Sequence, residues 1–204
     1  MTRESLVAPP RTPGGGDDSA VLTQSRTQPE RFGAIFDAYH AEIHGYAARR
    51  LGPDAAGDVA AQTFLEAFRA RHRYDPSRAS VRTWLYGIAT NLIGKQRRAE
   101  VRALRARARI GPEPDAEGHA DRVHVAVDAA GLRGALAAAL ADLADGDRDV
   151  LLLVALAELS HQEVAAALEI PYGTVGSRLN RARRKLREAL GGTNPMHAQE
   201  DHHG

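Results

Sequence analysis

Apolar residues recur every three or four positions through two long parts of the chain, which is the period of a helix that buries one face. Three such helices are predicted between residues 29 and 109, and the first of them ends near Leu51-Gly52-Pro53. The second covers about 54–71, and the third starts at Val81. The predicted core of the three helices consists of Phe32, Phe36, Tyr39, Ile43, Tyr46, Ala61, Phe64, Leu65, Phe68, Val81, Trp84, Leu85, Ile88, Ala89 and Leu92.

The second part of the chain predicts a helix over about 132–143, another over about 147–157, and then a helical hairpin. Ser160 and Glu163 have the spacing of a capping box, which predicts the start of the first hairpin helix. Pro171 cannot continue that helix, Gly173 allows a tight turn, and Thr174 is expected to cap the second helix.

The second hairpin helix is strongly basic outside its apolar face, which carries Val175 and Leu179. From Arg178 to Arg187 there are six basic residues and no acid. Such a helix can lie in the DNA major groove, with residues near its start on base edges and later arginines on phosphates. The formal net charge of only +1 does not reveal this basic helix or a second basic run over 95–109. An acidic segment over 113–128 offsets the charge of both.

The composition excludes several classes of protein. The chain has no cysteine, so disulfides, thiolate metal sites and cysteine nucleophiles are absent. No apolar run approaches the length of a membrane span, and the N-terminus lacks the apolar segment of a signal peptide, so we expect a cytoplasmic protein without membrane insertion. Scattered histidines and the lack of a phosphate loop argue against an enzyme, and no cofactor or metal site is predicted. His197, His202 and His203 are interpreted as part of a floppy polar tail.

These patterns predict an all-α protein with two small helical domains, at 29–109 and 132–191. An acidic flexible linker at 110–131 would join them. Residues 1–28, rich in Pro, Gly, Ser and Thr, and residues 192–204 are expected to be disordered.

The two blocks resemble regions 2 and 4 of the extracytoplasmic-function (ECF) group of bacterial sigma-70-type sigma factors. The region 2 resemblance rests on the segments Phe36–His40, Asp58–Phe64 and Trp84–Asn91. The region 4 resemblance rests on Leu143–Arg148, Leu159–Ala165, Pro171–Arg178 and Arg181–Arg183. The resemblance implies a promoter-specificity subunit that binds core RNA polymerase, through its β′ clamp and β subunits, and recognises the −10 and −35 promoter elements.

In such a protein, region 2 docks a helix on the β′ clamp and captures a flipped base of the −10 element in a loop. The resemblance assigns polymerase binding to Asp58 and Gln62, with Arg49 and Arg50 nearby. It assigns −10 recognition to Tyr74, Asp75, Ser77, Arg78, Ser80 and Asn91. A small polar pocket suits this task, because an unstacked base offers a π face and hydrogen-bonding edges.

Region 4 of the family reads the −35 element with the second helix of its hairpin, and its acidic linker imitates nascent RNA. The matching −35 residues are Thr174, Ser177, Arg178, Asn180, Arg181 and Arg184. The chain departs from the common pattern at Gly57, Lys95 and Gly176, which leaves its promoter sequence open. An anti-sigma factor is a further expected partner.

Other classes of function remain open at this point. One is a helix-turn-helix DNA-binding transcriptional regulator that acts without joining polymerase, and another is a helical adaptor that binds only protein. The N-terminal block separates them from the leading hypothesis, because a simple regulator does not need a loop and an asparagine suited to melted DNA.

Overall fold

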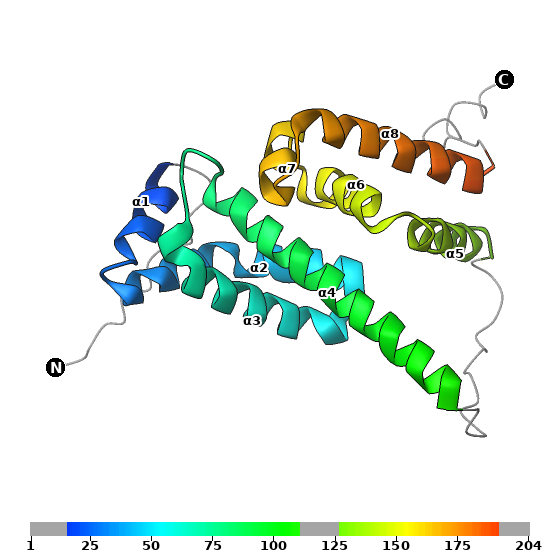
Figure 1. Ribbon diagram of the computed structural model, residues 1–204, viewed down its shortest axis with the longest axis horizontal. Helices are drawn as coiled ribbons and strands as arrows, with labels where there is room; N and C mark the ends of the chain where they lie inside the picture. Colours follow the sequence, from blue (N-terminus) through cyan, green and yellow to red (C-terminus); the bar gives the residue numbers. More distant parts are fainter. Residues whose placement is uncertain (1–15, 111–126, 192–204) are drawn as a thin grey trace. The chain divides into compact units, whose positions relative to one another are not determined.

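The computed structural model describes residues 16–110 and 127–191, and within them all regular secondary structure is helical. The chain divides into two compact units. The first contains α1 (Gly16–Gln24), η1 (Pro29–Arg31), α2 (Phe32–Leu51), α3 (Pro53–Ala70), η2 (Arg71–Arg73) and the start of α4 (Val81–Ile110) (Figure 1). Gly52, at φ +89°, ends α2, and Pro53 begins α3 at the position where its missing N–H is no loss.

The core of the first unit is built from one face each of α2, α3 and α4. Its tyrosines bury their rings and keep a partner for each hydroxyl. The Tyr46 and Thr90 hydroxyls lie 2.9 Å apart, and Tyr86 donates to Glu42 at 3.0 Å. Each fully buried Val, Ile, Leu or Phe side chain contributes about 1.5–3 kcal/mol to folding. The buried apolar residues of these helices are Phe32, Ile35, Tyr39, Ile43, Tyr46, Ala47, Ala56, Val59, Ala60, Phe64, Ala67, Val81, Leu85, Tyr86, Ala89 and Ile93.

The buried face of α3 differs from the predicted one. Leu65 of α3 is 42% exposed and Phe36 of α2 is 39% exposed, although both were expected in the core. Ala61 is exposed as well. The helices instead pack along small residues such as Ala60 and Ala67, which allow their backbones a close approach, and this turns Ala61 and Leu65 toward solvent.

The predicted disorder of residues 1–28 is wrong for the part that the structure describes. Residues 16–24 form α1, and η1 follows at 29–31. Val21 and Leu22 are buried against the first unit, and Ser25 is fully buried with its hydroxyl bonded to the carbonyl of Leu22 at 2.6 Å. Composition suggested disorder because the Pro/Gly-rich stretch precedes α1, whereas the burial of Val21 and Leu22 fixes the segment.

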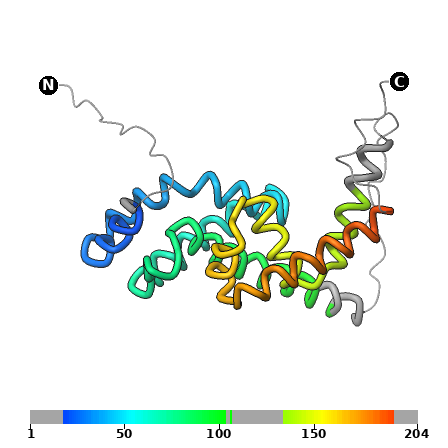
Figure 2. The backbone as a smooth tube through the Cα atoms, turned by 90° about the horizontal axis from the view of Figure 1, so that it is seen from above, coloured from blue at the N-terminus to red at the C-terminus, as the bar shows by residue number. Residues whose placement is uncertain are grey.

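The second unit includes α5 (Val127–Ala141), α6 (Asp145–Ala157) and α8 (Tyr172–Ala189), and α7 (His161–Leu168) lies between α6 and α8 in sequence. Figure 2 shows the course of these helices from a second direction. Val150 and Leu153 of α6 are fully buried. On α8, Val175 and Ala182 are fully buried and Leu179 is nearly so. The predicted linker at 110–131 was too long, because α4 includes Ile110 and α5 already starts at Val127.

The turn between α7 and α8 is built differently from the prediction. Glu169 takes the left-handed conformation at φ 51°, and Pro171 is the N-cap residue of α8, which has no side-chain cap. Thr174 is therefore inside the first turn of α8 and does not cap it, while its N–H bonds the Pro171 carbonyl at 2.9 Å. Gly173 lies within the helix and supplies no positive φ.

No helix in the described ranges is long and apolar enough to cross a membrane. The predicted disordered tail at 192–204, residues 1–15 and the acidic segment 111–126 lie outside the described residues.

Candidate nucleic-acid interface

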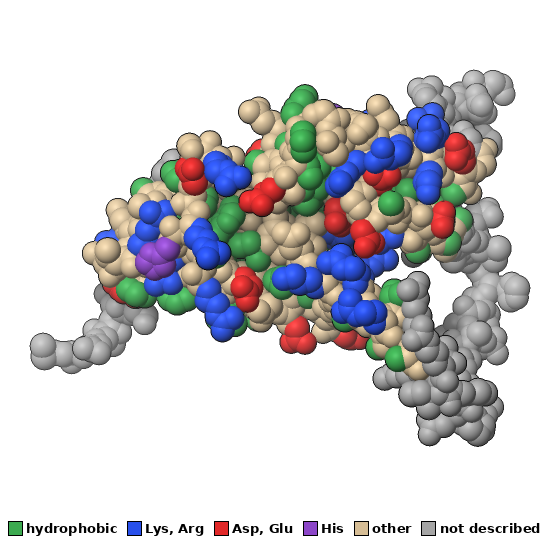
Figure 3. All heavy atoms as spheres, viewed as in Figure 1, with side chains coloured by type: hydrophobic (Ala, Val, Ile, Leu, Met, Phe, Trp, Pro, Cys, Tyr) green, Lys and Arg blue, Asp and Glu red, His purple; other side chains and the backbone are tan. Residues whose placement is uncertain are grey.

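Helix α8 presents one broad face of polar and basic side chains. Val175, Leu179 and Ala182 bury its other side, so the helical period turns Ser177, Asn180 and Arg184 outward. All three outward residues are exposed. Figure 3 shows Lys and Arg side chains gathered along α8.

The outward polar groups of α8 are little engaged by the protein itself. The Ser177 hydroxyl donates to the Thr174 carbonyl of its own helix at 3.0 Å. Arg184 approaches Glu188 at 3.8 Å, and both side chains are about two-thirds exposed, so water screens the pair. These contacts are weak enough to be exchanged for bonds to DNA.

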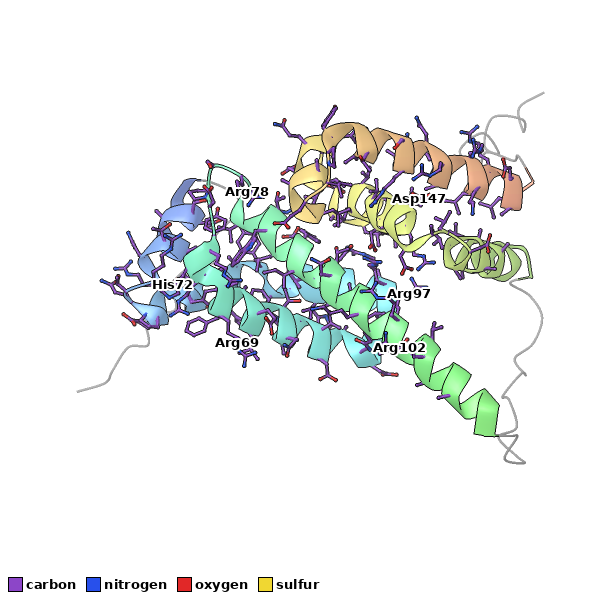
Figure 4. The ribbon with its side chains drawn as sticks, viewed as in Figure 1. Arg69, His72, Arg78, Arg97, Arg102 and Asp147 are labelled. Carbon is purple, nitrogen blue, oxygen red and sulfur yellow. The ribbon has the colours of Figure 1, made fainter. Side chains whose placement is uncertain are left out.

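Arg181 is held much more firmly than its neighbours. Its Nε and one terminal nitrogen donate to the two carboxylate oxygens of Asp147 on α6, at 3.0 and 2.9 Å. Asp147 is almost completely buried, and Figure 4 shows it on α6. The hydrogen bond from Arg181 is the main cause that lowers the pKa of the Asp147 carboxyl. This bidentate pair fixes the guanidinium on the side of α8 nearest α6.

Arg178 also turns toward α6. A Cβ added to Gly146 would lie 2.6 Å from a terminal nitrogen of Arg178, so the glycine makes room for this guanidinium. Its charge contributes to the lowered pKa of Asp147. Of the six residues assigned to −35 recognition, the structure therefore brings Ser177, Asn180 and Arg184 onto one free face. Arg178 and Arg181 lie beside Asp147, and Thr174 is half-buried.

The loop between η2 and α4 is ordered by its own polar groups. The Asp75 carboxylate accepts bonds from the backbone N–H and the hydroxyl of Ser77, at 2.9 and 2.7 Å, and these bonds lower the pKa of Asp75. The Ser80 hydroxyl accepts the N–H of Thr83 at 3.1 Å, so Ser80 caps α4. Asp75, Ser77 and Ser80 are exposed, as is Arg78, which Figure 4 labels at the loop.

Tyr74 was expected to contact DNA, but its side chain is buried, with only 3% exposed. Its hydroxyl donates to the Ala79 carbonyl at 3.0 Å and lies 2.8 Å from the Ser19 hydroxyl. Its ring lies 5.2 Å from that of Trp84, and burial raises the pKa of the phenol. Tyr74 thus shapes the loop from inside and offers no surface to a base.

Asn91 is exposed on α4, ten residues after the helix begins. At 1.5 Å per residue, it lies about 15 Å along the helix axis from Val81. Asn91 is therefore about three helical turns from the end of the loop along the axis of α4.

The residues assigned to polymerase binding fall into two groups. Asp58 and Gln62 are exposed on α3 and border a shallow groove of about 300 Å³ that Leu92 and Gln96 of α4 complete. Arg49 is exposed, whereas Arg50 is half-buried and donates to the Tyr46 hydroxyl at 2.8 Å. Arg50 is thus tied to the core.

Comparison with known proteins identifies the family. Residues 35–110 match the family model of sigma-70 region 2, and residues 133–186 match that of sigma-70 region 4. The chain is 30% identical over 185 residues to the probable RNA polymerase sigma-C factor of Mycobacterium bovis, covering 86% of this chain and 94% of the relative. The ECF sigma factor SigC of Mycobacterium tuberculosis matches equally well. The chain therefore belongs to the ECF group of sigma-70-type sigma factors.

Two further relatives agree with this membership. The sigma factor is 32% identical over 168 residues to the ECF sigma factor SigW of Bacillus subtilis, covering 79% of this chain and 89% of that protein. Its fold matches that of CnrH, solved in complex with the cytosolic domain of CnrY, with a TM-score of 0.60 and 26% identity over 87% of this chain and 99% of the other. As a sigma factor the protein is not an enzyme, and its partners are core RNA polymerase and promoter DNA.

Two exposed residues of the sigma factor were missed by the sequence reasoning. Leu65 lies one helical turn beyond Gln62 on the exposed side of α3, so this side is partly apolar. Tyr172 is 63% exposed in the first turn of α8. No local pattern in the sequence reported the exposure of either residue.

Proposed function

We propose that the free face of α8 reads the −35 element of the promoters that this sigma factor serves. The observation that carries the proposal is the exposure of Ser177, Asn180 and Arg184 on one face, opposite the buried Val175 and Leu179. A helix anchored on one side and polar on the other can enter the major groove without disturbing its own unit. Ser177 and Asn180 are suited to base edges, and Arg184, farther along, to a phosphate.

The first unit supplies the contacts to polymerase and to melted DNA in this proposal. The exposed side of α3, with Asp58, Gln62 and Leu65, docks on the β′ clamp. The loop residues Asp75–Ser80 and Asn91 hold the −10 strand. Support comes from the polar, exposed character of the loop and from its internal bonds, which fix its shape before DNA arrives.

Transcription with purified core polymerase on a promoter library tests the proposal and identifies the promoter. Asn180→Ala should reduce the discrimination between bases at one −35 position by about 1–3 kcal/mol, the cost of a lost base contact. Arg184→Ala should instead weaken all promoters alike and reduce the dependence on salt, as expected for a lost phosphate contact. If both variants keep the wild-type ranking and strength of promoters, α8 is not the reader.

Footprinting with and without core polymerase tests the joint action of the two units. Each unit alone makes few DNA contacts. When polymerase holds both units and one of them is bound to its promoter element, the effective concentration of the second unit at its own element rises. We expect specific protection only with polymerase. Tight specific binding by the free sigma factor would favour a regulator that acts alone.

Cytoplasmic location and control by an anti-sigma factor complete the proposal. Support for a protein partner comes from CnrH, which was solved in complex with the cytosolic domain of CnrY. Co-purification of the tagged sigma factor from cells, followed by inhibition of transcription with the recovered protein, tests this part.

A further inference from the structure

Helix α1 and the segment after it are joined to η2 and to the loop 74–80 by hydrogen bonds between residues far apart in sequence. Ser19 reaches the Tyr74 hydroxyl across 55 positions, at 2.8 Å. Arg26 donates through Nε to the Arg71 carbonyl at 3.3 Å and through a terminal nitrogen to the Tyr74 carbonyl at 2.6 Å. In return, Arg71 donates to the Ser25 carbonyl at 3.0 Å. Figures 1 and 2 both place α1 beside this part of the chain.

Tyr74 carries these contacts into the loop itself. It is the first residue after η2, and its hydroxyl donates to the carbonyl of Ala79, just before the Ser80 cap of α4. Since that hydroxyl proton is used, Ser19 donates to the phenol oxygen. One buried side chain therefore ties both ends of the loop together, and Ser19 and Arg26 hold that side chain and its backbone.

Helix α1 is itself anchored to the body of the first unit. Val21 and Leu22 are buried, with exposed fractions of 7% and 0%. The Tyr39 hydroxyl of α2 donates to the Asp18 carboxylate at 2.6 Å. The bonds from Ser19 and Arg26 thus connect the loop to a fixed support, and they are partly shielded from water.

We propose that α1 and Arg26 form a brace, defined as Ser19, Arg26 and the buried Val21 and Leu22, that holds the loop in the shape that accepts the −10 base. The brace touches no DNA and acts through Tyr74, so its members are positioning residues. A preformed loop binds an extruded base without a further ordering cost. This inference rests on the proposed role of the loop in −10 recognition and gives the N-terminal segment a part in promoter opening.

The test compares Arg26→Gln with Arg31→Gln in the full-length sigma factor. Both changes remove one positive charge from the same segment, but Arg31 is exposed and bonds only Gln24 and Gln28 among the contacts seen. Arg26→Gln should lower the rate of open-complex formation on duplex promoters at least about tenfold, the order of one charge-assisted hydrogen bond. Amide hydrogen exchange in residues 75–80 should speed up by a similar factor, while Arg31→Gln leaves both quantities unchanged.

Two further variants separate positioning from loss of folding. Arg26→Lys keeps the charge but loses the forked geometry, so it should recover only part of the activity. Ser19→Ala removes one hydroxyl from α1 and should speed exchange in the loop while the unfolding midpoint followed by Trp84 fluorescence changes little. The inference is overturned if exchange and opening rates of Arg26→Gln equal those of Arg31→Gln.

Arg78→Ala, in the exposed part of the loop, distinguishes this failure from failure of the proposed function. If Arg78→Ala and Asn91→Ala both open promoters at the wild-type rate, the loop does not serve −10 recognition and both ideas fall. If these variants are slow and Arg26→Gln is normal, the loop function stands and only the brace is refuted.

Discussion

Replacing Arg148 by methionine should unfold the second unit at a lower temperature and leave the first unit intact. The Arg148 side chain is 6% exposed, and its guanidinium caps the end of α5. It donates to the carbonyls of Leu140, Ala141 and Leu143 at 2.6, 2.7 and 2.6 Å, and to the Asp145 carboxylate at 3.1 Å. Methionine keeps much of the volume and removes every donor.

The magnitude follows from the three carbonyl bonds. A hydrogen bond to a charged group stabilises a fold by about 1.5–3 kcal/mol, but the contributions are not additive, and burying the guanidinium has its own cost. We therefore expect a loss of about 3–5 kcal/mol, as for other buried charged networks that lose one member. Such a loss is a large part of the roughly 5–15 kcal/mol that stabilises a typical domain.

The single tryptophan makes the assay selective. Trp84 lies in α4 within the first unit, so its fluorescence follows that unit, whereas circular dichroism follows the helices of both. Arg148→Met should lower the melting temperature of the second unit, which only circular dichroism detects, and leave the fluorescence transition of the first unit unchanged. Arg187→Met, at an exposed position of α8, is the matched control and should change stability by less than about 0.5 kcal/mol. Equal shifts for the two variants would refute the assigned role of Arg148.

Three other outcomes are expected. Asp147→Asn should make the stability of the second unit less dependent on acid pH. Because Arg181 lowers the pKa of Asp147 in the folded protein, the ionised carboxylate stabilises the wild type above the unfolded pKa of about 3.9. This stabilisation is lost as the pH falls through the lower pKa of the folded state. Thermal unfolding across about pH 2–6 measures this, and parallel curves for the two proteins would contradict it. Asn91→Ala should slow transcription from duplex templates and be partly rescued by a pre-melted −10 bubble, since the bubble removes an unpairing cost of a few kcal/mol; equal loss on both templates would instead indicate a bracing role. Leu65→Glu should weaken competition for core polymerase about tenfold if Leu65 is central to the interface, with an unchanged Trp84 unfolding transition; unaltered competition would remove Leu65 from the docking surface.

The helices of both units and the family were readable from the chain because their signals are local. The period of apolar residues predicted α2 from Phe32 to near Leu51, and the basic run after Val175 predicted the exposed side of α8. Both depend on residues within a few turns of one another. The family membership rests on the order of two such blocks, which is also written in the sequence.

The structure was needed wherever a residue's environment is set by partners far along the chain. Tyr74 looks like a loop residue free to meet DNA, yet Ser19, Ala79 and Trp84 bury it, and no local pattern reports a partner 55 positions away. The pairing of Arg181 with Asp147, 34 positions earlier, was likewise beyond any local pattern.

The sequence by itself determined an all-helical sigma factor with a basic last helix, because helical period and residue type act over short distances. Only the tertiary structure decided which polar groups stay free for DNA and which are used inside the protein. A guanidinium is already hydrogen-bonded when the fold places a carboxylate or carbonyl within reach of it. The carbonyls of Tyr74 and Arg71 do this for Arg26. The sequence alone does not reveal such contacts, because the partners are far apart along the chain.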